Sequence, residues 1–227
     1  MKIGVLTAMT SELDQLAALL EDKVEIRSGL FTYIVGRCGK NDIVLRQCGI
    51  GKVNAALGTA ELIKSFSPQC IISTGVAGGI DTSVGIMDVV VSRQTCYHDV
   101  WCAMGCEYGQ VQGMPTYFKG NARLVEHALN LDTPTRIHAG LICTGDQFIT
   151  AQKELEKIKR EFPEGLACDM ESAAIAQTCY IYQMPFVSFR IISDTPGAKD
   201  HTEQWENFWV EIANRSFQVT ETYLKTL

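Results

Sequence analysis

Residues 167–176 read ACDMESAAIA, and they join an apolar, strand-like segment to an alanine-rich, helix-like one. A second apolar segment, PFVSFRIISD at 185–194, follows this helix. Strands that alternate with helices in this way are typical of an α/β sheet with helices on both faces. Ligands of such sheets collect at the carboxyl ends of the strands, so the two acids at the junction, Asp169 and Glu171, are candidate site residues.

The rest of the chain extends this pattern into one domain. The segments 24–29, 31–37 and 42–49 are short, alternating and separated by turn residues, which predicts an antiparallel meander. No linker, charge block or internal repeat divides the sequence. We therefore predict a single α/β domain over residues 1–227, with a central mixed β-sheet flanked by helices. Further strands are expected at 2–8, 70–75, 87–94, 139–146 and 166–170, and further helices at 10–20, 51–66, 151–161 and 203–225.

Composition and charge exclude several classes of protein. Of the 227 residues, 46% are hydrophobic and 20% are charged, which is ordinary for a globular domain. The net charge of −6 gives no support to nucleic-acid binding. No apolar run approaches the roughly 18–20 residues that span a bilayer, and the N-terminus lacks a signal-peptide pattern. Nine scattered cysteines favour reduced thiols over a disulfide scaffold, so a cytoplasmic location is expected.

Carboxylates recur where the predicted strands end. They are Glu12, Asp146, Asp169, Glu171 and Asp194. A single acid at such a position commonly caps the following helix, where the free amides and the helix dipole stabilise it by about 0.3–1 kcal/mol. Recurrence at several strand ends favours a shared ligand site instead. Thr10 or Ser11 is the expected N-cap of the first helix.

Other motifs are weaker. The glycine-rich stretch TGVAGG at 74–79 is expected to be a turn that follows a strand, but it lacks the spacing of a phosphate-binding loop. Cys96, His98, Cys102 and Cys106 are residue types that zinc accepts, but their spacing is not one of the usual pairs, and no metal site is predicted. The chain has no G-x-S-x-G motif that would indicate a serine nucleophile.

Taken in order, several segments resemble the nucleoside phosphorylase/nucleosidase superfamily over nearly the whole chain, and most closely its 5′-methylthioadenosine/S-adenosylhomocysteine nucleosidases. They are MKIGVLTAMTSEL, GIGKVNAA, STGVAGG, YHD, EYGQ, TGDQFI, ACDMESAAIA and PFVSFRIISD. The resemblance implies hydrolysis of the N-glycosidic bond of 5′-methylthioadenosine and S-adenosylhomocysteine, with release of adenine. It also implies a homodimer, a small nucleoside as substrate and no cofactor.

The resemblance assigns the two catalytic acids. Glu12 matches the residue that activates water, and Asp194 matches the general acid that protonates the departing adenine at N7. Cleavage of this bond builds positive charge on the ribose and negative charge on the purine, so an acid and a base with different pKa values divide the work.

The substrate-binding residues also come from the resemblance. Met170 and Glu171 match a pair that packs under the ribose and binds its hydroxyls, which leaves a structural role for Asp169. The remaining positions that match substrate-site or supporting residues are Met9, Gly78, Phe148, Ile149, Arg190 and Ser193.

The chain departs from the family pattern at two places. Val76 stands where many members have serine, which affects the expected positioning of water. The loop 99–106 is about one residue shorter, with Met104 and Cys106 at familiar aromatic positions, so the 5′ specificity stays open.

Three alternatives stay open at this stage. The first is hydrolysis of a futalosine-like nucleoside, and the second is a non-catalytic nucleoside sensor. The third is phosphorolysis, although residues 8–20 hold no arginine or lysine that would bind phosphate.

Overall fold

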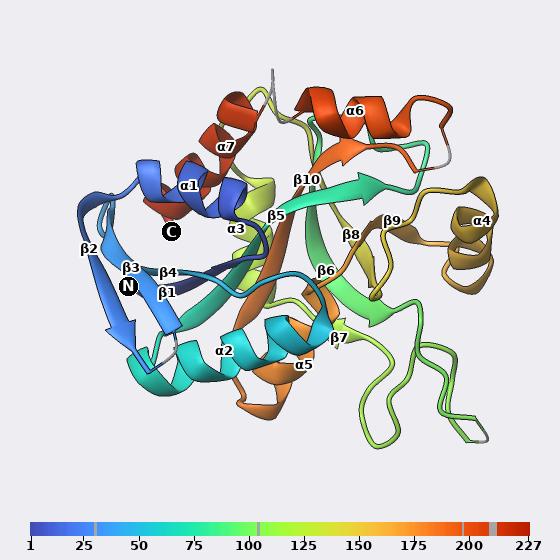
Figure 1. The fold of residues 1–227 in the computed structure, drawn as a ribbon, viewed down its shortest axis with the longest axis horizontal. Coiled ribbons are helices and arrows are strands. Elements are labelled where there is room, and N and C mark those ends of the chain that lie inside the picture. Colours follow the sequence, from blue (N-terminus) through green and yellow to red (C-terminus); the bar gives the residue numbers. More distant parts are fainter. Residues whose placement is uncertain (30, 104, 197, 209–212) are drawn as a thin grey trace.

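A computed structural model describes residues 1–29, 31–103, 105–196, 198–208 and 213–227. Its centre is one sheet in the order β10-β6-β8-β9-β5-β1-β4-β3-β2, with β7 paired to β6 (Figure 1). β10 also pairs with β5, so β5, β10, β6, β8 and β9 close into a ring. The strands are β1 (Lys2–Thr7), β2 (Glu21–Ser28), β3 (Phe31–Cys38), β4 (Asn41–Gln47), β5 (Cys70–Gly79), β6 (Val89–Tyr97), β7 (Phe118–Lys119), β8 (Ile137–Thr144), β9 (Gly165–Asp169) and β10 (Phe186–Asp194).

The sheet is mixed, as the sequence predicted. β2, β3 and β4 form the expected antiparallel meander. β1 runs parallel to both β4 and β5, and β5 runs parallel to β10. The carboxyl ends of β1, β5 and β10 therefore point the same way, which gathers the residues that follow them at one edge of the sheet.

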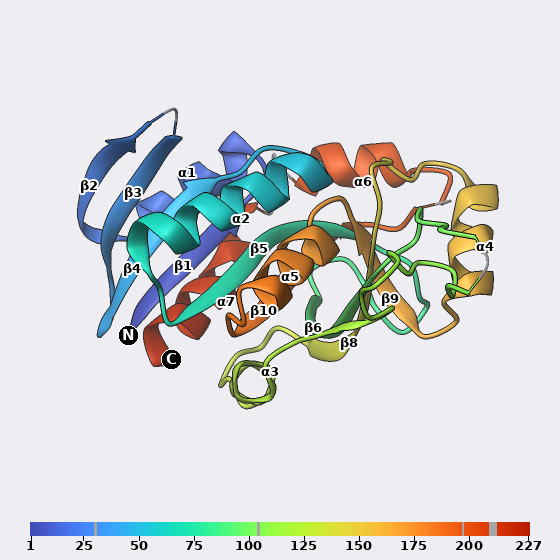
Figure 2. The ribbon, with the colours of Figure 1, turned by 90° about the horizontal axis from the view of Figure 1, so that it is seen from below.

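Helices cover both faces of the sheet. α2 and α5 lie side by side across one face (Figure 2), where they pack on Leu6 and Ile71. α1, α3 and α7 lie on the other face, over Ile3, Val5 and Phe189. The helices are α1 (Thr10–Ala18), α2 (Lys52–Phe66), α3 (Ala122–Leu129), α4 (Gln152–Glu161), α5 (Ser172–Ile181), α6 (His201–Asn207) and α7 (Ala213–Thr226).

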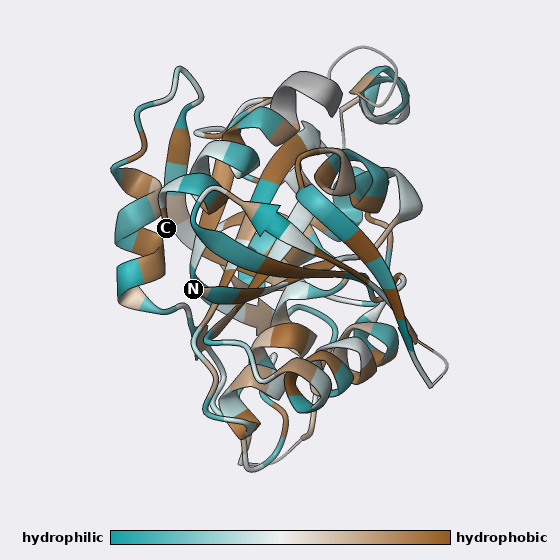
Figure 3. Cartoon of the chain, turned by 90° about the vertical axis from the view of Figure 1, so that its left-hand side faces the viewer, coloured by the Kyte–Doolittle hydropathy of each residue, from teal (hydrophilic) through white to brown (hydrophobic). Residues whose placement is uncertain are grey.

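Alternation along the strands explains these two layers. Ile3 and Val5 of β1 belong to one core cluster, and the intervening positions face the other helical layer. Figure 3 shows brown, hydrophobic stretches along the central strands and teal, polar stretches on the outer parts of the helices. Within the described residues, no helix combines the length and apolarity needed to cross a membrane.

Four expectations differ from the structure. TGVAGG is not a turn, because β5 continues to Gly79 through its pairing with β10 and β9. The N-cap of α1 is Met9 rather than Thr10 or Ser11, and the Glu12 carboxylate reaches back to accept the N–H of this N-cap residue. The short elements α3 and β7 were not foreseen. The described residues of the expected final helix form α6 and α7, and 209–212 lie outside them.

Candidate functional site

A cavity of about 420 Å³ opens at the edge where the carboxyl ends of the strands meet. Nine of the ten site residues expected from sequence line it, although they come from five separate parts of the chain. They are Met9, Glu12, Gly78, Phe148, Ile149, Met170, Glu171, Ser193 and Asp194. The tenth, Arg190, is buried in the sheet beside them.

Glu12 is a buried carboxylate held by three backbone amides. Its Oε2 accepts the N–H groups of Ala8 at 2.9 Å and Met9 at 3.0 Å, and its Oε1 accepts the N–H of Val76 at 3.0 Å. Burial raises the pKa of Glu12, while the charge of Arg190 and the three amides act in the opposite direction. Each carboxylate oxygen has about two lone-pair sites, so Oε1 can still accept a hydrogen bond from a ligand or water.

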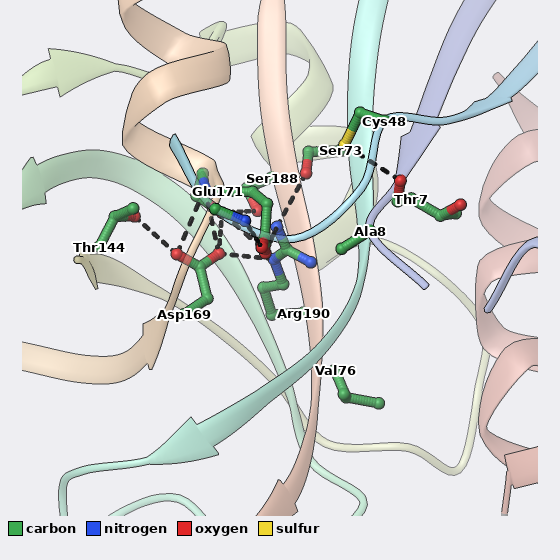
Figure 4. A network of polar contacts seen from close by, with 12 residues as sticks. Thr7, Ala8, Cys48, Ser73, Val76, Thr144, Asp169, Glu171, Ser188 and Arg190 are labelled. Carbon is green, nitrogen blue, oxygen red and sulfur yellow. Dashed lines mark hydrogen bonds and ion pairs between the residues drawn. The ribbon is translucent and has the colours of Figure 1, made fainter. Parts of the chain in front are cut away.

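Arg190 is the cation of the site, and it is almost entirely buried. Figure 4 shows its guanidinium beside Asp169. Its Nε lies 2.8 Å from Asp169 Oδ2, and its Nη2 lies 3.8 Å from Glu171 Oε2. Nη2 also donates a hydrogen bond to Ser73 Oγ at 3.0 Å. One guanidinium thus links a strand-end carboxylate to the carboxylates around the cavity.

Asp169 uses its lone pairs within the protein. Thr144 Oγ1 donates to Oδ1 at 2.6 Å, and the backbone N–H and hydroxyl of Ser172 donate to the carboxylate as well. With Arg190 on Oδ2, this side chain joins β8, β9, α5 and β10. The geometry agrees with the structural role expected for Asp169 from sequence.

Glu171 has fewer partners than Asp169. The backbone N–H of Gly51 donates to its Oε1 at 2.9 Å. Burial raises the pKa of Glu171 to about 7, the charge of Arg190 opposes this shift, and the negative charge of Asp169 adds to it. Glu171 therefore changes its charge near neutral pH, in a cavity that it lines.

Asp194 ends β10, is buried and lines the cavity. The hydroxyl of Ser193 donates to its Oδ1 at 2.7 Å. Burial raises the pKa of Asp194, while the Ser193 hydrogen bond and the charge of His201 oppose the shift. A carboxyl that holds its proton more tightly than usual is suited to donate that proton to a ligand.

Gly75 makes the close approach of Glu12 and Arg190 possible. A Cβ at this position would lie 2.3 Å from Glu12 Oε1 and 2.7 Å from Arg190 Nη1. No side chain fits in that space. The glycines of STGVAGG thus leave room for buried side chains in a strand, rather than forming a turn.

The mouth of the cavity is apolar and aromatic. Phe148 is 55% exposed and packs near His201 and Trp205, with ring centroids 6.4 and 6.2 Å apart. Sequence reasoning missed Trp205, Ile50, Gln147 and Pro196, which also line the cavity. Ile50 and Gln147 lay inside motifs quoted from the sequence, GIGKVNAA and TGDQFI, so a sequence signal existed for these two residues but not for Trp205 or Pro196.

Val76, the departure from the family pattern, lines the cavity beside Glu12. Its backbone N–H holds Glu12 Oε1, but its side chain offers no hydroxyl there. In the loop 99–106, Trp101 is exposed and stacks on Tyr108 at 6.2 Å between ring centroids. Met104 lies outside the described residues.

The cysteines and histidine considered as zinc ligands do not share a site. Cys96 Sγ lies 3.8 Å from Cys143 Sγ in the core, whereas Cys102 is exposed. The His98 ring lies against Gly145, and burial lowers its pKa. Across the described ranges, no group of three or more His, Cys, Asp or Glu side chains is arranged to hold a metal ion.

Known proteins are similar to this chain in sequence and fold over nearly its whole length. A family model described as the phosphorylase superfamily matches residues 2–225. The 5′-methylthioadenosine/S-adenosylhomocysteine nucleosidase of Desulfotalea psychrophila is 40% identical over 96% of this chain and 95% of its own length. The protein of the same name from Staphylococcus epidermidis is 38% identical over 99% of this chain and 100% of its own length.

Solved structures agree with the sequence comparison. The S-adenosylhomocysteine nucleosidase of Streptococcus pyogenes, in complex with 5-methylthiotubericidin, superposes with a TM-score of 0.92 at 39% identity, covering 100% of this chain and 97% of that one. The nucleosidase of Colwellia psychrerythraea, in complex with adenine, superposes with a TM-score of 0.93 at 38% identity, covering 100% of this chain and 96% of that one.

Removal of the Asp169 charge tests whether the buried ion pair with Arg190 holds the site together. We expect Asp169→Asn to lower the free energy of unfolding by about 3–5 kcal/mol, because it leaves a buried guanidinium without its nearest counter-charge. Urea unfolding followed by circular dichroism measures this change. Asp22→Asn, at the exposed ion pair with Arg37, is the matched control and should leave the unfolding midpoint in place. A loss below about 1 kcal/mol for Asp169→Asn would contradict the expectation.

Proposed function

Because this chain belongs to the phosphorylase superfamily, and within it to the 5′-methylthioadenosine/S-adenosylhomocysteine nucleosidases, we propose that its cavity hydrolyses these two nucleosides. Water adds to the anomeric carbon of the ribose, the N-glycosidic bond breaks, and adenine leaves with a proton. The other product is the 5-thio-substituted ribose. The observation that carries the proposal is one cavity lined by two buried carboxyls, Glu12 and Asp194, that come from different parts of the chain.

Asp194 is proposed as the general acid. A purine leaves as an anion unless it is protonated, and Asp194 is a carboxyl whose pKa burial raises, with the Ser193 hydroxyl as its orienting partner. Phe148 and Ile149 lie at the same cavity and are proposed to hold the base, by stacking and through the main chain respectively.

Glu12 is proposed as the general base that activates water. Three amides fix its orientation, and Oε1 retains acceptor capacity toward the cavity. Burial raises its pKa, which makes the ionised carboxylate a stronger base than an exposed glutamate. Met9, Gly78, Met170 and Glu171 are proposed to surround the ribose, with the carboxylate of Glu171 accepting its hydroxyls.

Water rather than phosphate is the nucleophile in this proposal. Phosphate binding relies on arginine or lysine side chains that reach the anion. Of the described residues that line the cavity, none is an arginine or a lysine. Arg190 is buried behind the cavity, with Asp169 against its Nε.

We propose that the protein is a homodimer whose interface is the exposed apolar surface of α2 and α5. Val53 and Leu57 on α2 and Tyr180 and Ile181 on α5 are each more than half exposed, and the two helices lie side by side (Figure 2). Exposed apolar patches of this kind mark protein interfaces. Ile50, which lines the cavity, is also exposed and lies two residues before α2, so the patch borders the site.

A cytoplasmic location is also part of the proposal. It rests on the nine cysteines, all of which are free thiols in the structure. Cys96 and Cys143 are side by side with their sulfurs 3.8 Å apart and not bonded, which suits a reducing compartment.

Adenine release tests the reaction and the general acid together. We expect the protein to release adenine from 5′-methylthioadenosine in phosphate-free buffer, at a rate that added phosphate does not change. Asp194→Asn should lower kcat by about 10²–10⁴-fold, because an amide cannot supply the proton. Asp88→Asn is the control, since Asp88 pairs with His138 away from the cavity. Release that requires phosphate would identify a phosphorylase, and an unimpaired Asp194→Asn would exclude this residue as the acid.

The oligomeric state tests the proposed dimer. Light scattering after size exclusion should give about twice the chain mass of 25.1 kDa for the wild type. Leu57→Asp should shift the protein toward the monomer, because it places a charge within an apolar interface. Leu129→Asp, at an exposed position on α3, should leave the mass unchanged. A wild-type protein that is monomeric at the concentrations used would refute the proposal.

A further inference from the structure

Three charged side chains next to the cavity form a polar clasp, which consists of Lys52, Asp99 and Asp146. Lys52 begins α2, Asp99 follows β6 and Asp146 follows β8. Lys52 Nζ donates to both carboxylate oxygens of Asp99, at 2.9 and 2.8 Å. The backbone N–H of Asp146 donates to Asp99 Oδ2 at 2.8 Å. The clasp therefore ties the start of one helix to the ends of two strands.

The clasp also completes the N-terminus of α2. The N-cap residue of this helix is Gly51, which has no side chain to accept the free N–H groups. Asp146 Oδ1 supplies the missing acceptor and takes the backbone N–H of Lys52 at 2.8 Å. Gly51 has φ +92°, and a Cβ there would lie 3.0 Å from Asp146 Oδ1. The turn is thus built for glycine, with Asp146 packed close against it.

The neighbouring amide of the same turn points into the site. The backbone N–H of Gly51 donates to Glu171 Oε1 at 2.9 Å. Two consecutive N–H groups therefore hold two different carboxylates, with Glu171 in the cavity and Asp146 in the clasp. The two N–H groups belong to successive peptide planes that meet at the Gly51 Cα, so a displacement of the Lys52 amide at the start of the helix is passed to the Gly51 amide through this one residue.

We propose that Lys52, Asp99 and Asp146 are positioning residues for the reaction, because they hold the Gly51 N–H against Glu171 and so fix this carboxylate for the ribose hydroxyls. This inference rests on the proposed function of Glu171. The clasp does not touch the substrate in this scheme and acts only through the backbone turn at Gly51.

The hydrogen bond from the Gly51 N–H influences the pKa of Glu171, because several opposing effects act on this carboxyl group. Burial is the largest influence and raises the pKa of Glu171 to about 7, whereas Arg190 and the Gly51 N–H favour the ionised form. Asp169 and Glu12 raise the pKa, and the Cys48 thiol lies near enough for Glu171 to influence it. Loss of the Gly51 contact removes a stabiliser of the charged form, so the pKa of Glu171 moves upward. The other groups that face Glu171 are unchanged by this loss.

The pH dependence of kcat/KM for 5′-methylthioadenosine tests the clasp. In the wild type, we expect kcat/KM to fall as the pH drops through about 7, because protonated Glu171 cannot accept both hydroxyls. Asp99→Asn should move this acid limb upward by about half a pH unit or more, which is about a threefold loss of kcat/KM on the limb. On the alkaline plateau the loss should be much smaller. A purely structural role would lower kcat/KM by the same factor at every pH.

Two further variants make the test decisive. Asp81→Asn breaks the Asp81–Lys159 ion pair of 2.7 Å, which is partly buried like Lys52–Asp99, and it should keep the wild-type profile. Lys52→Met removes the positive charge of the clasp and should shift the acid limb in the same direction. This variant keeps the test available if Asp99→Asn does not fold. If the folded clasp variants keep the wild-type acid limb, the inference is wrong.

A direct titration separates this inference from the proposed function. Carbon-13 NMR of the Glu171 carboxyl, identified by its loss in Glu171→Gln, reports the pKa without any substrate. We expect a higher pKa in Asp99→Asn than in the wild type and no change in Asp81→Asn. If the wild type releases no adenine but the titration shifts, the proposed reaction fails and the link through Gly51 stands. If adenine is released and the titration does not shift, only the clasp inference fails.

Discussion

One buried guanidinium, that of Arg190, sets the electrostatics of the site. Three buried carboxylates, Asp169, Glu171 and Glu12, surround the guanidinium, and its one positive charge does not balance their three negative charges. Asp169 takes the shortest contact, at 2.8 Å from Nε. Glu12 and Glu171 are left with weaker compensation, and burial therefore raises the pKa of both. The raised pKa values of Glu12 and Glu171 thus reflect burial that this one charge offsets only in part.

The sheet topology places that cation. β10 lies between β5 and β6, and its pairing with β5 runs from Ile71 to Gly78, which brings Arg190 opposite Gly75. The absence of a side chain at Gly75 leaves room for the guanidinium and for Glu12 on the same spot of the sheet. Ring closure by β9 then brings Asp169 and Glu171 next to them. A glycine in the interior of a strand, which usually weakens pairing, here makes the site possible.

Local patterns in the sequence predicted much of this arrangement. They could not predict the contacts between residues that are far apart in the chain. The strand ends that carry Glu12, Asp169, Glu171 and Asp194 were placed from periodicity, because an apolar run followed by an acid is a local signal. The extension of β5 through Gly79 was not predicted, since its cause is pairing with strands about 90 and 115 residues away. Nor could periodicity show that Gly51 contacts Glu171, 120 residues further on. The lining residues Pro196 and Trp205 lie in no quoted motif and become site residues only through the fold.

The acids that flank Met170 show how two carboxylates one residue apart take different roles. Asp169 receives a threonine hydroxyl, a serine hydroxyl, a serine amide and a guanidinium, so its lone pairs are fully used within the protein. Glu171 receives one amide at 2.9 Å and a guanidinium nitrogen only at 3.8 Å, so it retains acceptor capacity toward the cavity. A carboxylate with all its lone pairs engaged can brace a fold but has nothing to offer a ligand. One with unused lone pairs in a buried cavity gains from a substrate that supplies hydroxyl donors, because an incompletely paired buried charge is costly. Whether such an acid stabilises the fold or is available to a ligand therefore depends on the number of hydrogen-bond donors around it, and not on the acid itself.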